Sequence, residues 1–152
     1  MRTIVIILIS ISLIVPVLAR GADEYETVSP QKVRFTSLHI YIDSGNQALA
    51  AYQFELKATA GQIKIVGVEN GEHPAFDEPP YYDPAALAHD RIIIAAFSTD
   101  KDLPKGRTRI ASIQLQIIGD VEPEYALELT VAADADGNKI PAAITYEKGE
   151  QK

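Results

Sequence analysis

Hydrophobic and polar residues alternate strictly in three segments of the chain, 52–58, 111–117 and 125–131. A period of two turns one set of side chains toward a core and the other toward solvent, which is the pattern of a half-buried β-strand. The three segments therefore predict strands. The core residues expected from them are Tyr52, Phe54, Leu56, Ile113, Leu115, Leu127, Leu129 and Val131.

Four further segments predict strands with less regular patterns. Segments 63–68 and 91–97 are short apolar runs rich in β-branched residues, and the second is apolar on both faces, as in a central strand. Segment 140–146 is expected to be the final strand. In segment 33–43 the apolar phase slips between Phe35 and Leu38, which predicts a bulge or two consecutive short strands.

Turn-forming residues separate these segments, and Asp136-Gly137 between alternating segments favours a hairpin. No window of 11 residues after Gly21 keeps a helical period. Seven or more strands bounded by turns in one domain predict an all-β fold, an antiparallel β-sandwich. The turn-forming clusters are 43–46, 60–61, 105–106, 119–120 and 136–138.

One connection is much longer than the others. Residues 69–90 join two predicted strands through 22 residues that include four prolines. Compact domains rarely keep so long a connection without a use for it, so we expect a binding loop. Within it, Asp83 and Pro84 favour one or two helical turns, as N-cap and first helical residue. Its aromatic residues either contact a ligand or pin the loop to the sandwich edge. These candidate ligand-binding residues are Phe76, Tyr81 and Tyr82.

The N-terminus has the anatomy of a secretory signal peptide. Arg2 precedes an apolar run broken by two serines, Pro16 follows as a helix breaker, and Val17-Leu18-Ala19 offers a cleavage site. We expect a signal peptide removed before Arg20. An uncleaved membrane anchor is the alternative, because the 17 uncharged residues approach the length that spans a bilayer. The expected organisation is a signal peptide over 1–19, a flexible lead-in over 20–31, one domain over 32–147 and a tail over 148–152.

Charge and composition exclude several classes of function. The chain has 14 Lys and Arg against 21 Asp and Glu, a formal net charge of −7, and loss of Arg2 with the leader makes it more acidic. This balance argues against a nucleic acid partner, since Lys and Arg supply most of the affinity for phosphates. The sequence has no cysteine, which excludes a disulfide scaffold, a thiolate metal site and a cysteine nucleophile.

Candidate catalytic and metal-binding patterns are weak. The long connection holds His73, His89 and several carboxylates without the spacing of a histidine metal site, and the chain has no Gly-x-Ser-x-Gly elbow. Asp134 opens a segment similar to the start of a calcium loop. Thr145 stands where a bidentate glutamate is needed, so a hairpin is the favoured interpretation. We therefore expect no catalytic residues, no metal and no cofactor, a structural calcium being unsupported.

Outward-facing polar residues on the strands give one further candidate. Ser112, Gln114 and Gln116 form a polar stripe of low charge, which suits either a recognition surface or an ordinary solvated sheet face, and the second interpretation is favoured. His39 stands opposite the apolar side chains of its strand, so we expect it at the surface.

Six segments, 33–43, 50–56, 65–69, 92–99, 109–113 and 131–140, share an order and spacing that spans nearly the whole domain. In this the chain resembles the cohesin modules of bacterial exported proteins, within the wider group of carbohydrate-binding-type β-sandwiches. The resemblance implies a jelly-roll sandwich that acts as a receptor and holds a partner module on one sheet face. The chain departs from the family at 58–63, where cohesins usually have an aromatic-Asp pair, and no partner-contacting residue is carried over.

These observations predict an exported, non-catalytic binding module of a bacterial host, placed in the periplasm, at the cell surface or outside the cell. Protein–protein recognition of the cohesin type is the leading function, and binding of a polysaccharide is the alternative. A membrane-anchored accessory protein of the envelope or of a secretion complex is a third interpretation, which requires the N-terminal segment to remain uncleaved.

Overall fold

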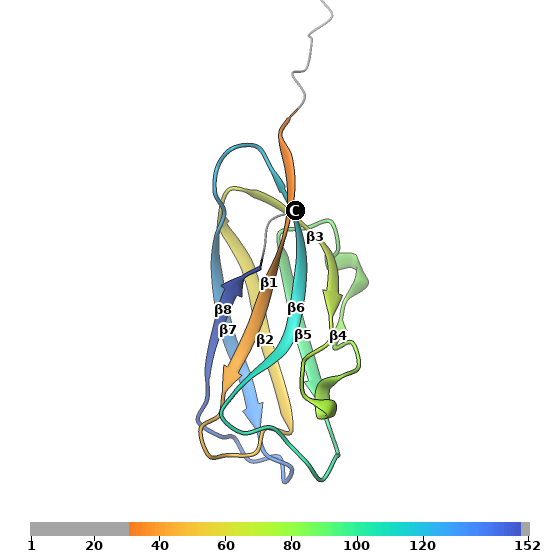
Figure 1. The fold of residues 1–152 in the computed structure, drawn as a ribbon, viewed down its shortest axis with the longest axis vertical. Coiled ribbons are helices and arrows are strands. Elements are labelled where there is room, and N and C mark those ends of the chain that lie inside the picture. The colour runs from red at the N-terminus through yellow and green to blue at the C-terminus, as the bar shows by residue number, and fades with distance from the viewer. Residues whose placement is uncertain (1–30, 150–152) are drawn as a thin grey trace, which may run out of the picture.

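Eight strands form the domain in a computed structural model that describes residues 31–149 (Figure 1). The expected signal peptide, nearly all of the lead-in and the end of the tail lie outside the described residues. The elements are β1 (Val33–Asp43), β2 (Ala51–Ala60), β3 (Gln62–Glu69), the 3₁₀ turn η1 (Pro74–Phe76), β4 (Tyr81–Tyr82), the 3₁₀ turn η2 (Pro84–Ala86), β5 (Arg91–Phe97), β6 (Arg107–Ile118), β7 (Glu124–Ala133) and β8 (Ala143–Lys148).

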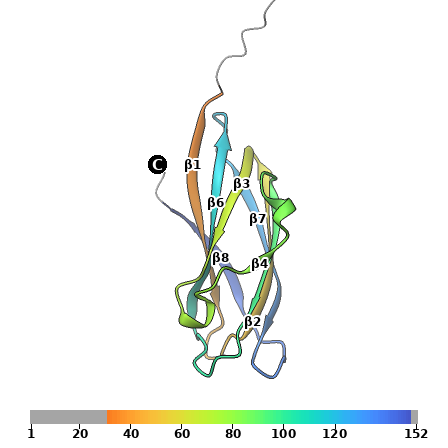
Figure 2. The same cartoon turned by 90° about the vertical axis from the view of Figure 1, so that its right-hand side faces the viewer.

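The strands form two four-stranded sheets that pack face to face, as Figure 2 shows from the side. Sheet A has the order β3-β6-β1-β8, and sheet B has the order β4-β5-β2-β7. All of their strand pairs are antiparallel. Apart from the link between β4 and β5, every connection crosses from one sheet to the other. The predicted antiparallel β-sandwich is therefore confirmed.

The core lies between the sheets and is filled mainly by isoleucine, leucine and three large aromatic side chains, Tyr52, Phe54 and Phe76. The Tyr52 hydroxyl donates a hydrogen bond of 3.0 Å to the backbone oxygen of Ile110, which satisfies its buried polar atom. Burial raises the pKa of the Tyr52 phenol. Five predicted core residues are buried: Tyr52, Phe54, Leu56, Ile113 and Leu115.

The β7 strand departs from the predicted core because its alternation is interrupted. Leu127 and Leu129 are half-buried against the core, opposite Leu56 and Phe54. Between Gln53 and Phe54 of β2 the register with β7 shifts, so that one extra residue of β7 bulges there. Beyond the bulge, the side chains that the strict alternation placed inward point outward, and the others point inward. The prediction of Val131 as a core residue is wrong, since its side chain is 41% exposed.

The phase slip in β1 has a different cause from the predicted one. β1 is a single strand that pairs with β6 without interruption from Val33 to Ile40, so the expected bulge or break near Phe35 is absent. Thr36 occupies an inward position, and its hydroxyl has no hydrogen-bond partner among the described residues. Phe35 points outward. The apparent slip in the hydrophobic pattern therefore arises because the polar Thr36 occupies an inward position. The register shift lies farther along, beyond Ile40.

The end of the domain also differs from the prediction. The turn at Asp136-Gly137 is confirmed, and it closes a short hairpin in which the N–H of Ile140 donates to the carbonyl of Ala132 over 2.9 Å. Ile140 is buried, but it lies before the first residue of β8. Because Pro141 has no N–H group, it cannot extend the hairpin, and the chain crosses to sheet A. The last strand is thus Ala143–Lys148, not 140–146.

Replacement of Leu115 by alanine tests the core. Leu115 is fully buried, so Leu115→Ala should lower the free energy of unfolding by about 2–5 kcal/mol. Leu129 is only half-buried, so Leu129→Ala should lower the free energy of unfolding by less than Leu115→Ala does. Val131→Ala should change it by about 0.5 kcal/mol or less, because the side chain is on the surface. Urea unfolding followed by circular dichroism measures all three. A cost at Val131 equal to that at Leu115 would contradict the register of β7.

Candidate functional site

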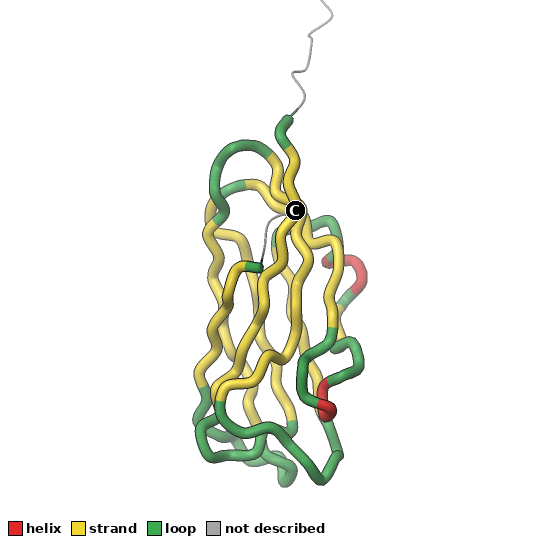
Figure 3. The backbone as a smooth tube through the Cα atoms, viewed as in Figure 1, coloured by secondary structure: helices red, strands yellow, loops and turns green. Residues whose placement is uncertain are grey.

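The long connection 69–90 is fastened along the sandwich and is not a free loop (Figure 3). It contains η1, the short strand β4 and η2, and β4 pairs with β5 at the edge of sheet B. The predicted helical turn is confirmed as η2, with the Asp83 carboxylate accepting from the N–H of Ala85 over 2.9 Å. In η1, His73 and Pro74 repeat this arrangement. The η1 turn was not predicted, although its capping residue is likewise followed by a proline.

Phe76 anchors the first half of the connection in the core. Its side chain is 3% exposed, and its ring meets the ring of Tyr52 edge to face, with the centroids 5.1 Å apart. The backbone closes around it, since the Gly71 N–H donates to the Phe76 carbonyl over 2.8 Å. A Cβ on Gly71 would lie only 2.8 Å from the carbonyl oxygen of Arg109, so no larger residue fits there unchanged.

The three predicted ligand-binding residues therefore have three different environments. Phe76 is a core residue and is not available to a partner. Tyr82 is half-buried and packs against the core. Tyr81 is 68% exposed on the outer face of sheet B. The sequence left ligand contact and pinning as alternatives for all three; the structure shows Phe76 and Tyr82 packed against the core and Tyr81 exposed.

A contiguous apolar surface surrounds Tyr81. Tyr81 of β4 lies opposite Ala95 of β5, whose outward neighbours along the strand are Ile93 and Phe97. Phe97 is 65% exposed, and its ring is nearly parallel to that of Tyr81, at 10° with the centroids 6.2 Å apart. We call these four residues the β4–β5 patch. Phe97 was not among the predicted site residues, although a period of two in β5 places it outward with Ile93.

Next to the patch on sheet B, Arg91 and Glu55 form an ion pair with each other. Arg91 donates from Nε and Nη2 to the two carboxylate oxygens of Glu55, over 2.9 and 2.7 Å. The hydrogen bonds from Arg91 hold the pKa of Glu55 below its usual value. This side of the patch therefore presents a closed ion pair rather than a free charge.

The exposed apolar residues of sheet A lie in two places: Val33 and Phe35 are adjacent outward positions of β1, with Ile118 opposite Val33, and Val66 lies on β3. Val33, Phe35 and Val66 are each about half-exposed. The partner of Phe35 on β6 is Gln116, and Gln114 faces the β3 bulge that contains Val66. Gln114 and Gln116 separate Phe35 from Val66, so the apolar group of sheet A is confined to the start of β1, and among residues 31–149 it has no stacked ring pair like that of the β4–β5 patch.

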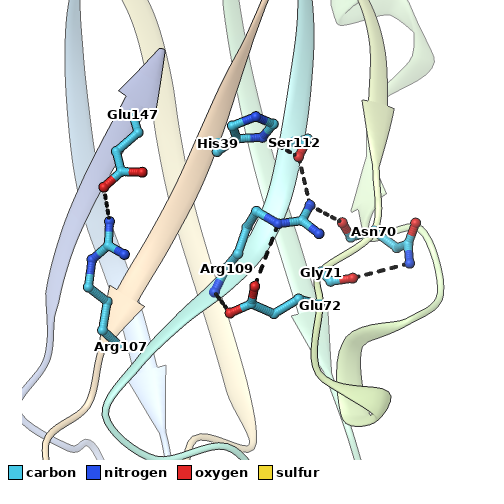
Figure 4. A network of polar contacts seen from close by, with 8 residues as sticks. All are labelled: His39, Asn70, Gly71, Glu72, Arg107, Arg109, Ser112 and Glu147. Atoms are coloured by element: carbon cyan, nitrogen blue, oxygen red, sulfur yellow. Dashed lines mark hydrogen bonds and ion pairs between the residues drawn. The ribbon is translucent and has the colours of Figure 1, made fainter. Parts of the chain in front are cut away.

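A polar network lies on the outer face of sheet A (Figure 4). The imidazole Nδ1 of His39 is 2.8 Å from the hydroxyl of Ser112, and Nη1 of Arg109 donates to the same hydroxyl over 2.8 Å. Arg109 also donates to the carbonyl of Asn70, and its backbone N–H donates to the Glu72 carboxylate over 2.9 Å. The network joins β1 and β6 to the start of the long connection. His39 lies on the outer face of its strand, as predicted, and is half-buried, whereas Ser112 is buried and is not part of a solvated stripe.

The geometry of this network is typical of a structural role, in which it holds the connection against sheet A, and not of a catalytic site. Ser112 is 1% exposed, so a substrate cannot reach its hydroxyl without local opening. The carboxylate of Glu72 interacts with Arg109 and not with the imidazole that it would have to orient in a nucleophilic triad. The contacts satisfy a buried hydroxyl and hold residues 70–72 against sheet A.

Asp134 uses its carboxylate within its own turn. Oδ1 accepts from the backbone N–H groups of Asp136 and Asn138 over 3.0 and 2.8 Å, as expected for the predicted hairpin. The hydrogen bonds from Asn138 contribute most to holding the pKa of Asp134 below its ordinary value of 3.8. Across residues 31–149, no group of three or more His, Asp or Glu side chains is arranged to hold a metal ion.

Residues 31–149 thus form an all-β sandwich that carries the β4–β5 patch on the outer face of sheet B. Comparison with known proteins finds no matching family, no matching curated protein and no matching solved structure. No helix among the described residues has the length and hydrophobicity needed to cross a membrane.

Substitution of Phe76 and of Tyr81 distinguishes an aromatic residue that anchors the connection from one that is exposed on its surface. Phe76→Ala empties a core position and should cost about 3–5 kcal/mol of unfolding free energy. Tyr81→Ala should cost less than about 1 kcal/mol, because it removes only an exposed ring pair. Replacement of 74–82 by a Gly-Ser linker should likewise destabilise the domain. Equal melting temperatures for Phe76→Ala and the wild type would refute the anchoring role.

Asp134→Ala tests the turn through its pH dependence. Because the folded-state pKa of Asp134 is lowered, its carboxylate stabilises the folded state above the ordinary pKa of 3.8, and this stabilisation is lost as the pH falls below that value. The variant should melt below the wild type at pH 7, and the difference should shrink below pH 3.8. Asp136→Ala is the matched control. A gap in melting temperature that stays constant with pH would contradict the assignment.

Proposed function

We propose that the chain is an exported, non-catalytic binding module that recognises another protein, in the manner of a cohesin, through the outer face of sheet B. The observation that carries the proposal is the β4–β5 patch. Single exposed hydrophobic residues are ordinary, but contiguous ones on a sheet face are typical of an interaction site. Export rests on the signal-peptide pattern of residues 1–19 alone.

The composition of the patch favours a protein partner. Ile93 and Ala95 contribute aliphatic surface between the rings of Tyr81 and Phe97. Mixed aliphatic and aromatic surface with few free charges is the composition of the centre of a protein interface. The closed Glu55–Arg91 pair at its border suits the polar rim of such an interface, where ion pairs contribute little energy.

Polysaccharide binding is the second candidate, and one observation favours it. The nearly parallel rings of Tyr81 and Phe97 offer flat faces on which sugar rings stack. Against this, the patch has only two exposed aromatic side chains, and an aliphatic side chain lies beside them.

The test compares two partner classes in parallel. The mature chain is immobilised and exposed to the secreted and envelope proteins of its host, and separately to insoluble polysaccharides. A captured protein is then purified and its Kd measured. The double variant Tyr81→Ala/Phe97→Ala should weaken that complex by about tenfold or more, since central aromatic residues supply much of the energy of an interface.

Phe35→Ala is the matched control, because Phe35 is 50% exposed on the opposite sheet. It should leave the Kd unchanged. Retention on a polysaccharide that the double variant abolishes would establish the alternative function. Loss of protein binding in Phe35→Ala, with the double variant unaffected, would move the recognition surface to sheet A and contradict the proposal.

A further inference from the structure

A pocket opens directly beside the β4–β5 patch. Its volume is about 260 Å³, and two segments line it, residues 74–81 of the long connection and residues 96–100 after β5. Tyr81 and Phe97 belong to both the patch and the pocket. A partner that covers the patch would therefore also reach the pocket.

Three carboxylates line this pocket and no cationic side chain does. Asp77 and Glu78 come from the connection, and Asp100 comes from the opposite segment. All three residues are exposed. The ion pairs formed among residues 31–149 include none of them, in contrast to Glu55 on the other side of the patch. The ionisable residues that line the pocket are thus all acidic.

The aromatic rings add a second attraction for positive charge. The faces of Tyr and Phe rings attract cations, and the guanidinium group of arginine stacks on them more often than the ammonium group of lysine does. Tyr81 and Phe97 are both largely exposed and line the acidic pocket. A planar guanidinium there would meet a ring on one side and carboxylate acceptors on the other.

The pocket is held in shape before any ligand arrives. Phe76 fixes η1 to the core, Pro80 is buried, and Tyr81 and Tyr82 pair with β5. Prolines at 74, 79 and 80 restrict the backbone of the same segment. A site that is ordered beforehand loses little conformational entropy when it binds.

We infer that this acidic, aromatic-bordered pocket receives an arginine side chain of the partner protein. The inference rests on the proposed function, because it gives the chemistry of one contact within the surface proposed there. The partner would carry an arginine next to the apolar surface that covers Tyr81 and Phe97.

Titration with an arginine side-chain probe tests the inference. N-acetyl-arginine amide is added to ¹⁵N-labelled protein, and N-acetyl-citrulline amide serves as the neutral probe of the same shape. Arginine should give saturable shifts of the amide signals of Asp77, Tyr81 and Phe97 at low salt, and citrulline should not. The double variant Asp77→Asn/Asp100→Asn should weaken arginine binding by about fivefold, and added salt should weaken it as well.

Asp136→Asn, which removes an exposed carboxylate elsewhere, should bind the probe like the wild type. Shifts that do not saturate, equal shifts with citrulline, or unchanged affinity in Asp77→Asn/Asp100→Asn would each overturn the inference. Failure of the proposed function is a separate result, since it requires that Tyr81→Ala/Phe97→Ala leaves partner binding intact. Loss of partner binding in that variant without any arginine effect would retain the function and reject the pocket.

Discussion

The contact between the rings of Phe76 and Tyr52 fixes the longest connection of the chain to the core of the sandwich. The surface of sheet B depends on this contact. With Phe76 buried, the chain has only a few residues before β4, so Tyr81 is brought opposite Ala95 and beside Phe97. The pocket between residues 74–81 and 96–100 has the same origin. A single buried ring therefore positions both the apolar patch and the acidic pocket.

The two sheets share a core but differ in their outer faces. Sheet A has polar side chains between its exposed apolar residues, and its network around Arg109 holds the connection in place. Sheet B leaves its apolar residues contiguous and its nearest ion pair closed. The network on sheet A braces the connection, and the outer face of sheet B carries the surface that we propose for recognition. The net charge of −7 further favours a basic partner surface, as do the carboxylates near Tyr81, which form no ion pair within residues 31–149.

Strand periodicity was enough to predict the sandwich and most of its core, because a period of two fixes which side chains face inward. It failed where one residue changes the phase. The bulge in β7 turned Val131 outward. In β1, the polar but inward-facing Thr36 led to the prediction of a bulge that is not there. The candidate site was predicted in part. Tyr81 was selected from its loop, whereas Phe97 and the buried state of Phe76 depend on the pairing of distant segments, which local pattern does not specify.

Site-specific photo-crosslinking tests the central claim, that a partner binds on sheet B beside Tyr81. A benzophenone amino acid replaces Tyr81 in one protein and Phe35 in another, since both positions are exposed and they lie on opposite sheets. Irradiation in the native host should give one defined adduct from position 81 and none from position 35. An adduct formed from position 35 alone would contradict the account.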